Sequence, residues 1–141
     1  MANLNIRFDA SLSYVQPAGQ RVPGPFLEVV LHANGKSTFR LPGLLDSGSQ
    51  RTIFQSAVAE SLDIDDITEG QPFRMSSASG LFTAYLFDVE LELHFDRRRL
   101  HCQIGFAGIP RHILGRDIIF HEYLFAFAER GQRLYYRRES P

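Results

Sequence analysis

The stretch Leu44-Leu45-Asp46-Ser47-Gly48-Ser49 places an acidic side chain at the end of an apolar run, followed by a hydroxyl and a glycine. A carboxylate in such a place is costly to bury, and the tight turn that Gly48 allows would let backbone N–H groups hold Asp46. Strand-like sequence resumes just afterwards at Thr52-Ile53-Phe54. An isolated Asp-Ser-Gly most often marks an ordinary turn at a strand end, so its meaning depends on the rest of the chain.

A second motif, Ile113-Leu114-Gly115-Arg116-Asp117, starts 67 residues after Asp46 (113 minus 46). Between the two motifs, the strand-like runs 72–75 and 81–86 enclose a tip of small residues, Ser76-Ser77-Ala78-Ser79-Gly80. Two short strands around such a tip predict a long, flexible hairpin. The chain therefore presents an acidic turn, a hairpin and a Gly-Arg-Asp segment, in that order.

Alternation of apolar and polar residues runs through most of the sequence and predicts strands. It is clearest from Val89 to Phe95 and from Leu100 to Phe106, on either side of a turn at Arg97-Arg98-Arg99. Helical spacing is limited to 55–62 and to a short segment at 116–121. We therefore expect a single all-β domain of about eight to ten strands with one or two short helices.

Composition and charge narrow the classes of function. The chain has 141 residues, of which 44% are hydrophobic, and its 15 basic and 16 acidic side chains give a net charge of −1. Such a chain has no global field to attract nucleic acid or an anionic membrane, and no apolar run approaches the roughly 20 residues of a membrane span. The first residues lack the pattern of a signal peptide, and a lone cysteine, Cys102, cannot form an internal disulfide. We expect a cytoplasmic protein.

In this order and spacing, the motifs resemble those of the retropepsin-like aspartic proteases. That family has two apolar residues before Asp-Thr/Ser-Gly, then a flap hairpin, then two apolar residues before Gly-Arg-Asp/Asn and a short helix. The resemblance runs from about Phe26 to Phe127 and implies a closed or sandwiched β-barrel with a flap. It divides the chain into an N-terminal strand with a Pro/Gly-rich arm, 1–25, and a retropepsin-like domain, 26–141.

The resemblance also implies an activity, the hydrolysis of peptide bonds by two aspartates that share one proton and activate a water molecule, with no metal or cofactor. The chain has one Asp-Ser/Thr-Gly, so a homodimer must supply the second Asp46 across a twofold axis. Ser47 and Gly48 would support the two carboxylates. An extended peptide would lie under a flap. The flap residues would be Ser76, Ser77, Ala78, Ser79, Gly80 and Leu81, and the segment Ile113-Leu114-Gly115-Arg116-Asp117 would be structural.

The chain also departs from the retroviral pattern at several positions, and each departure leads to a further prediction or leaves a feature open. Ser49 stands where retroviral members usually have alanine, and a hydroxyl that donates to the outer oxygen of Asp46 would favour the charged carboxylate and an acidic activity optimum. Gln50-Arg51 replace the aspartate that usually pairs with the arginine of the Gly-Arg segment, which leaves the partner of Arg116 open. The extra N-terminal strand, the helical segment 55–62 and the C-terminal hairpin are more similar to cellular or bacterial members. Retroviral dimers are tied by interleaved termini, so the dimer interface is also left open.

Other features favour plainer roles. The five histidines lack the spacing of metal ligands, and Cys102 alternates inward with its neighbours, as a buried core thiol would. The alternative to an enzyme is a catalytically silent retropepsin-like domain that dimerises or binds extended peptides, because a fold does not fix a function. The acidic residue at a strand end, together with a full-length flap, favours the protease.

Overall fold

The computed structural model describes residues 4–78 and 80–139. The strands of these residues are β1 (Ala10–Ser13), β2 (Phe26–Ala33), β3 (Lys36–Ser37), β4 (Leu41–Leu45), β5 (Ile53–Gln55), β6 (Gln71–Ser77), β7 (Gly80–Leu93), β8 (Arg99–Ala107), β9 (His112–Leu114), β10 (Tyr123–Ala128) and β11 (Arg133–Arg138). The helices of the same residues are the 3₁₀ helices η1 (Ser56–Leu62) and η2 (Ile67–Glu69) and the α-helix α1 (Ile119–Glu122). The fold is all-β with few short helices, as the alternation predicted.

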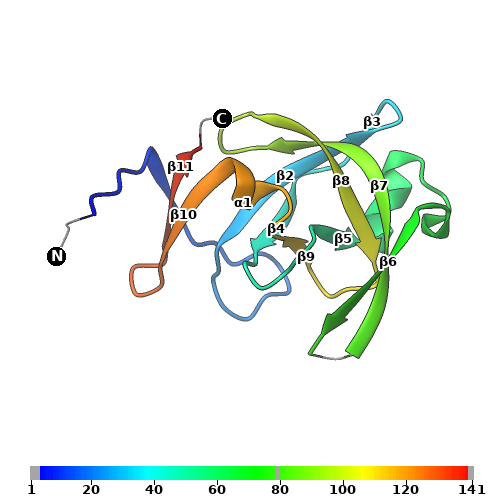
Figure 1. Cartoon of the computed structure of the whole chain (residues 1–141), viewed down its shortest axis with the longest axis horizontal. Coiled ribbons are helices and arrows are strands. Elements are labelled where there is room, and N and C mark those ends of the chain that lie inside the picture. Colours follow the sequence, from blue (N-terminus) through cyan, green and yellow to red (C-terminus); the bar gives the residue numbers. More distant parts are fainter. Residues whose placement is uncertain (1–3, 79, 140–141) are drawn as a thin grey trace.

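The larger sheet closes on itself and forms the predicted barrel (Figure 1). Its strand order is β3-β2-β4-β9-β5-β8-β7-β6, and β2 also pairs with β7, so that β3 and β6 lie outside the closed ring. Two neighbouring pairs are parallel, β4 with β9 and β5 with β8. The parallel pair β4 and β9 matters for function because it joins the two sequence motifs.

Strand β7 belongs both to the flap and to the barrel. Its residues from Gly80 to Leu86 pair with β6, and its later residues pair with β8 and β2. The sequence predicted two separate strands here, but the structure has one strand of 14 residues. Leu86 and Val89 are both buried although they are three positions apart, so the buried face switches while the pairing continues. This switch breaks the alternation and explains the wrong prediction.

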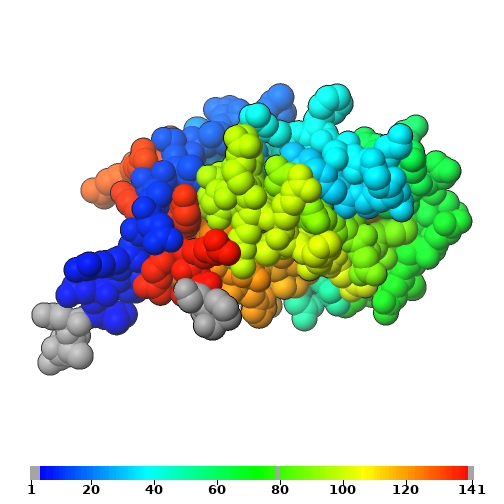
Figure 2. Space-filling model, turned by 90° about the horizontal axis from the view of Figure 1, so that it is seen from above, coloured from blue at the N-terminus to red at the C-terminus, as the bar shows by residue number. Residues whose placement is uncertain are grey.

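A smaller sheet, β1-β11-β10, joins the two ends of the chain, because β1 pairs with β11. The N-terminal strand expected within 1–25 is the short strand β1, which begins at Ala10. Tyr14, which follows it, is 8% exposed, and its hydroxyl donates to Glu129 in the turn between β10 and β11 at 2.7 Å. Figure 2 shows the blue N-terminal segment beside the red C-terminal strand at one end of the molecule, with green residues at the other. The predicted arm thus contributes a strand to the fold.

The helical segments differ from the predictions in type or in bounds. Of the segment 55–62, Gln55 ends β5 and the rest forms the 3₁₀ helix η1. Its buried residues Ala59 and Leu62 are three apart, which suits the three residues per turn of that helix. The helix expected over 116–121 starts later, at Ile119. Within 4–78 and 80–139, no helix is long and apolar enough to cross a membrane.

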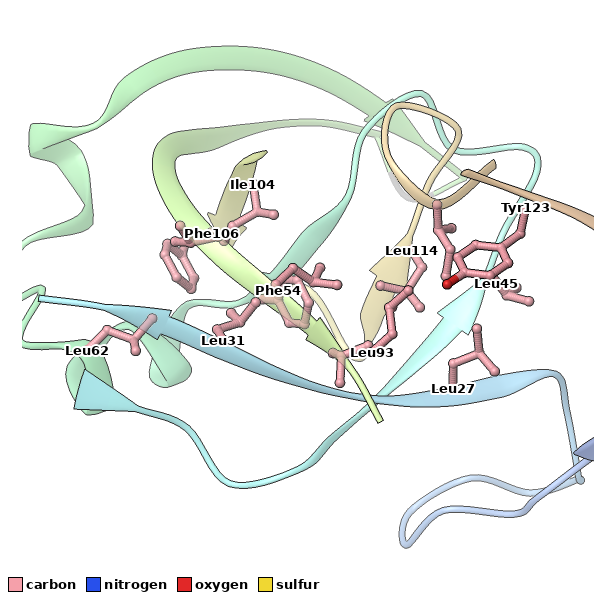
Figure 3. Packing of buried hydrophobic residues seen from close by; sticks show 14 of the residues in the cluster. Leu27, Leu31, Leu45, Phe54, Leu62, Leu93, Ile104, Phe106, Leu114 and Tyr123 are labelled. Carbon is pink, nitrogen blue, oxygen red and sulfur yellow. The ribbon is translucent and has the colours of Figure 1, made fainter. Parts of the chain in front are cut away.

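The core fills the barrel with side chains from nearly every strand (Figure 3). Phe54 from β5 and Phe106 from β8 have no exposed surface, and Leu31 and Leu93 approach them from β2 and β7. Tyr123 at the start of β10 is also buried in this cluster. The small sheet therefore packs against the barrel and shares its core.

Candidate active site

Asp46 lies directly after β4, where the parallel pairing of β4 with β9 brings the two motifs together. Leu44 pairs with Ile113 and Leu45 with Leu114. The backbone N–H of Asp46 continues this ladder and donates to the carbonyl oxygen of Leu114 at 3.0 Å. The carboxylate is half-buried at the end of a buried strand.

The turn at Gly48 holds the carboxylate as the sequence indicated. The N–H of Gly48 donates to Oδ1 of Asp46 at 2.9 Å, and the N–H of Ser49 donates to the carbonyl oxygen of Asp46 at 3.1 Å. Ser47 is exposed in the single chain. A charge-assisted bond from a backbone N–H fixes the orientation of a carboxylate more firmly than a bond from a mobile side chain.

The loop 46–51 rests against Gly115, where no larger residue fits. A Cβ atom built on Gly115 would lie 2.6 Å from the carbonyl carbon of Arg51 and 2.8 Å from the carbonyl oxygen of Ser49. Just beyond, the N–H of Arg116 donates to that same Ser49 oxygen at 2.9 Å. The glycine of the second motif is therefore a contact surface for the loop that carries Asp46.

Thr52 ties the two motifs together, a role that sequence reasoning missed. Its side chain is 1% exposed, and its hydroxyl donates to Oδ1 of Asp117 at 2.7 Å and accepts from the N–H of Gly115 at 3.1 Å. The partner of Asp117 is thus Thr52. A threonine at the start of a predicted strand, directly before the apolar pair Ile53-Phe54, was the available signal.

Ser49 does not act on Asp46 as the sequence predicted. Its hydroxyl donates instead to the carbonyl oxygen of Arg51 at 2.8 Å, two residues further on. A hydroxyl has one proton to donate, so it cannot also donate to the carboxylate. The proposed cause of an acidic optimum is therefore wrong, and Ser49 shapes the loop instead.

Arg116 has an exposed side chain that contributes to the wall of a cleft. Among residues 4–78 and 80–139, no carboxylate lies within 4.0 Å of its guanidinium group. Arg51, which stands near the position of the usual aspartate, instead lies with its guanidinium 4.5 Å from the centre of the Phe73 ring on β6. The loop is thus connected to the flap by a cation–π contact.

A cleft of about 860 Å³ opens beside Asp46, between its loop, the flap and the loop 108–111. The predicted flap residues that line it are Ser76, Ser77, Ala78, Gly80 and Leu81. Gly80 has a φ of +120°, which L side chains rarely adopt, and Leu81 is 69% exposed at the flap end. Ser79 lies outside the described residues. The structure therefore brings the acidic turn and the flap to the two sides of one groove.

His112 and Cys102 lie in the fold rather than in the cleft. His112 on β9 is 7% exposed, its Nδ1 faces the N–H of Gln55 at 3.1 Å, and burial lowers its pKa. Burial raises the pKa of the Cys102 thiol to about 12, with a smaller effect from Asp117. Cys102 is half-buried and packs against the core, so the sequence prediction of a buried core thiol is met in part. In the described part of the chain, no three His, Cys, Asp or Glu side chains gather as a metal site would require.

Neither a family model nor a curated protein matches this sequence. Among solved structures, the fold is similar to that of an EIAV protease complexed with the inhibitor HBY-793. The two sequences are 22% identical, the similarity covers 76% of this chain and 93% of that chain, and the TM-score is 0.53. At this identity the likeness concerns the fold, which is retropepsin-like.

Proposed function

We propose that this chain is an aspartic endopeptidase whose active unit is a homodimer with one Asp46 from each subunit. The observation that carries the proposal is Asp46 itself. It is fixed by the Gly48 N–H at 2.9 Å and faces a cleft that the flap also lines. The retropepsin-like fold and its protease neighbour support the same reaction class.

In the proposed reaction, one Asp46 carboxylate is ionised and the other holds a proton. The ionised carboxylate takes a proton from water as the water oxygen bonds to the scissile carbonyl carbon. The protonated partner gives its proton to the carbonyl oxygen, which would otherwise become negatively charged. When the tetrahedral intermediate collapses, the proton taken from water goes from its carboxyl group to the amide nitrogen, a hydroxyl proton of the intermediate returns to the other carboxylate, and the C–N bond breaks. No metal or cofactor takes part.

The remaining site residues would serve these two carboxylates and the substrate. Ser47, exposed in one chain, would hydrogen-bond across the twofold axis, and the main chain at Gly48 would bind the substrate backbone. The flap would pair with an extended peptide as an added strand and exclude water from the reacting atoms. The segment 113–117 would hold the loop in place through the contacts of Gly115 and Thr52.

We further propose that the protein belongs to the cellular or bacterial type. The pairing of β1 with β11 within one chain supports this, because it engages both ends internally. The boundary between an arm, 1–25, and the protease domain, 26–141, is part of the same proposal. The dimer would then form through surfaces other than interleaved termini.

An acidic optimum remains our prediction, now on the ground that two close carboxylates react only when they share one proton. We expect a bell-shaped rate profile centred below about pH 7. Since the Ser49 hydroxyl bonds to Arg51, Ser49→Ala should leave the centre of the profile unchanged. A shift of the centre of the profile in Ser49→Ala would indicate that the Ser49 hydroxyl acts on the Asp46 carboxylate after all.

The test compares the parent protein with Asp46→Asn for cleavage of an unfolded protein between about pH 3 and 8, together with the oligomeric mass. Asp65→Asn, at an exposed residue away from the cleft, is the matched control. Cleavage by a dimer that is lost in Asp46→Asn and kept in Asp65→Asn would establish the dyad. A dimer that cleaves nothing would favour the silent peptide-binding domain.

A further inference from the structure

The cleft beside Asp46 is positively charged, although the whole chain carries a net charge of −1. Arg74, Arg111 and Arg116 line it, whereas Asp46 is the one carboxylate among its described lining residues. This excess of positive charge cannot come from the overall composition. It is a local property of the groove in which the proposed reaction takes place.

The three arginines reach the cleft from different walls. Arg74 lies on β6 of the flap, opposite Thr83 of β7, while Arg111 precedes β9 and Arg116 follows it. All three side chains are exposed, and among residues 4–78 and 80–139 none is within 4.0 Å of a carboxylate. They surround the groove and are available to an incoming ligand.

Four arginines outside the cleft, Arg40, Arg98, Arg99 and Arg137, have carboxylate partners among the described residues. Arg98 donates to Glu122 at 2.6 Å, and Arg99 donates to Glu90 at 2.9 Å. The three arginines of the cleft have no such partner among the described residues. A carboxylate from a ligand would complete the pairing there, and the planar guanidinium group suits a carboxylate with two parallel hydrogen bonds.

Apolar side chains line the part of the cleft between these charges. Ile53, Met75, Phe82, Ile109 and Ile113 all contribute to it. A groove with an apolar middle and charged walls accepts a peptide with apolar side chains near the scissile bond and charged side chains further out. Low-dielectric walls also strengthen the field of the arginines within the groove.

We propose that the cleft selects peptides with acidic side chains flanking the scissile bond, with Arg74 and Arg111 as the specificity-determining residues. The selection rests on the proposed endopeptidase function, because the flanking positions are defined by the bond next to Asp46. A second subunit would double the set of arginines around the dyad. Arg116 is left out of the test because it also contacts the Asp46 loop through its backbone.

The test uses matched peptide mixtures with a central apolar pair and with Glu, Gln or Lys on both sides of it. We expect kcat/KM to be about tenfold higher for the Glu than for the Gln peptides and lower still for Lys. The preference should shrink to about twofold in 0.5 M salt, because salt screens exposed charges. Arg111→Gln and Arg74→Gln should each reduce the Glu-to-Gln ratio about threefold, and Arg111→Glu should favour the Lys peptides.

Arg40→Gln is the matched control, since Arg40 is exposed and lies outside the cleft, 3.6 Å from Glu28. It should leave the Glu-to-Gln ratio unchanged. Equal cleavage of the three mixtures would overturn the selection and leave the endopeptidase intact. A loss of the dimer in Arg74→Gln and Arg111→Gln would also overturn it, because the arginines would then serve assembly.

Binding to Asp46→Asn separates this proposal from the catalytic one. If the parent cleaves nothing, fluorescence anisotropy with the same peptides still reports the charge preference of the cleft. Tighter binding of the Glu peptides would then support the selection while the proposed catalysis fails. Equal binding, or displacement of the Glu peptides by a single-stranded oligonucleotide at lower concentration, would overturn it.

Discussion

Thr52→Val should destabilise the protein strongly, although the two side chains have nearly the same shape. The substitution removes a hydroxyl that donates to Asp117 at 2.7 Å and accepts from the Gly115 N–H at 3.1 Å. Thr52 is 1% exposed, so water cannot replace it, and Oδ2 of Asp117 is already buried without a partner among the described residues. An unpaired buried N–H costs about 1–3 kcal/mol, and a lost bond to a carboxylate costs a similar amount.

The expected loss is about 3 kcal/mol of the free energy of unfolding, a large part of the roughly 5–15 kcal/mol typical of a domain. Urea unfolding at one fixed protomer concentration measures it, because the stability of a dimer depends on concentration. Thr83→Val on β7 is the control, a half-buried threonine for which the described residues show no side-chain hydrogen bond. Thr52→Ser should recover most of the stability. If the losses in free energy of unfolding caused by Thr52→Val and by Thr83→Val differed by less than about 1 kcal/mol, the argument from the buried hydroxyl would be refuted.

Three further predictions follow from the described contacts. Gly115→Ala should reduce both stability and the proposed proteolysis, because its methyl group would meet backbone atoms of the loop 46–51. Gly131→Ala, with open space at its Cβ, should change neither, and equal unfolding midpoints of the two variants would contradict the argument. Burial lowers the pKa of His112, so on acidification the unfolded chain binds a proton before the folded chain does, and stability should fall as the pH drops below about 6.5. Thermal unfolding measured from pH 8 to 5 should show a weaker decline in His112→Phe than in the parent. Burial raises the pKa of Cys102 to about 12, so iodoacetamide at pH 8 should modify it in urea but not in the native protein, as intact mass would report.

The sequence predicted those parts of the site that depend on local order. The turn after Asp46 lies within a short segment that contains Gly48, and two apolar residues directly precede both Asp46 and Gly115. Their parallel pairing, which makes them neighbours, agrees with the retropepsin-like resemblance. Both motifs were therefore found, and the structure places them side by side.

The sequence could not predict the hydrogen-bond partners of the hydroxyl groups in the site. The hydroxyls of Ser49 and Thr52 each have several acceptors within reach. Which acceptor each hydroxyl uses depends on distances in the folded chain, and the spacing of residues along the sequence does not determine these distances. Thr52 bonds across 65 residues to Asp117, while Ser49 bonds only two residues away. The continuous β7 was missed for a related reason, since its side chains change face between two parts of the core.

The pairing of β1 with β11 has a consequence for control of the proposed activity. Each chain completes the sheet β1-β11-β10 by itself, so this sheet needs no strand from a partner. Assembly would then be an encounter between two finished molecules, and at low abundance the number of active sites would grow with the square of the protomer concentration. The level of expression would then set a threshold for the proposed proteolysis.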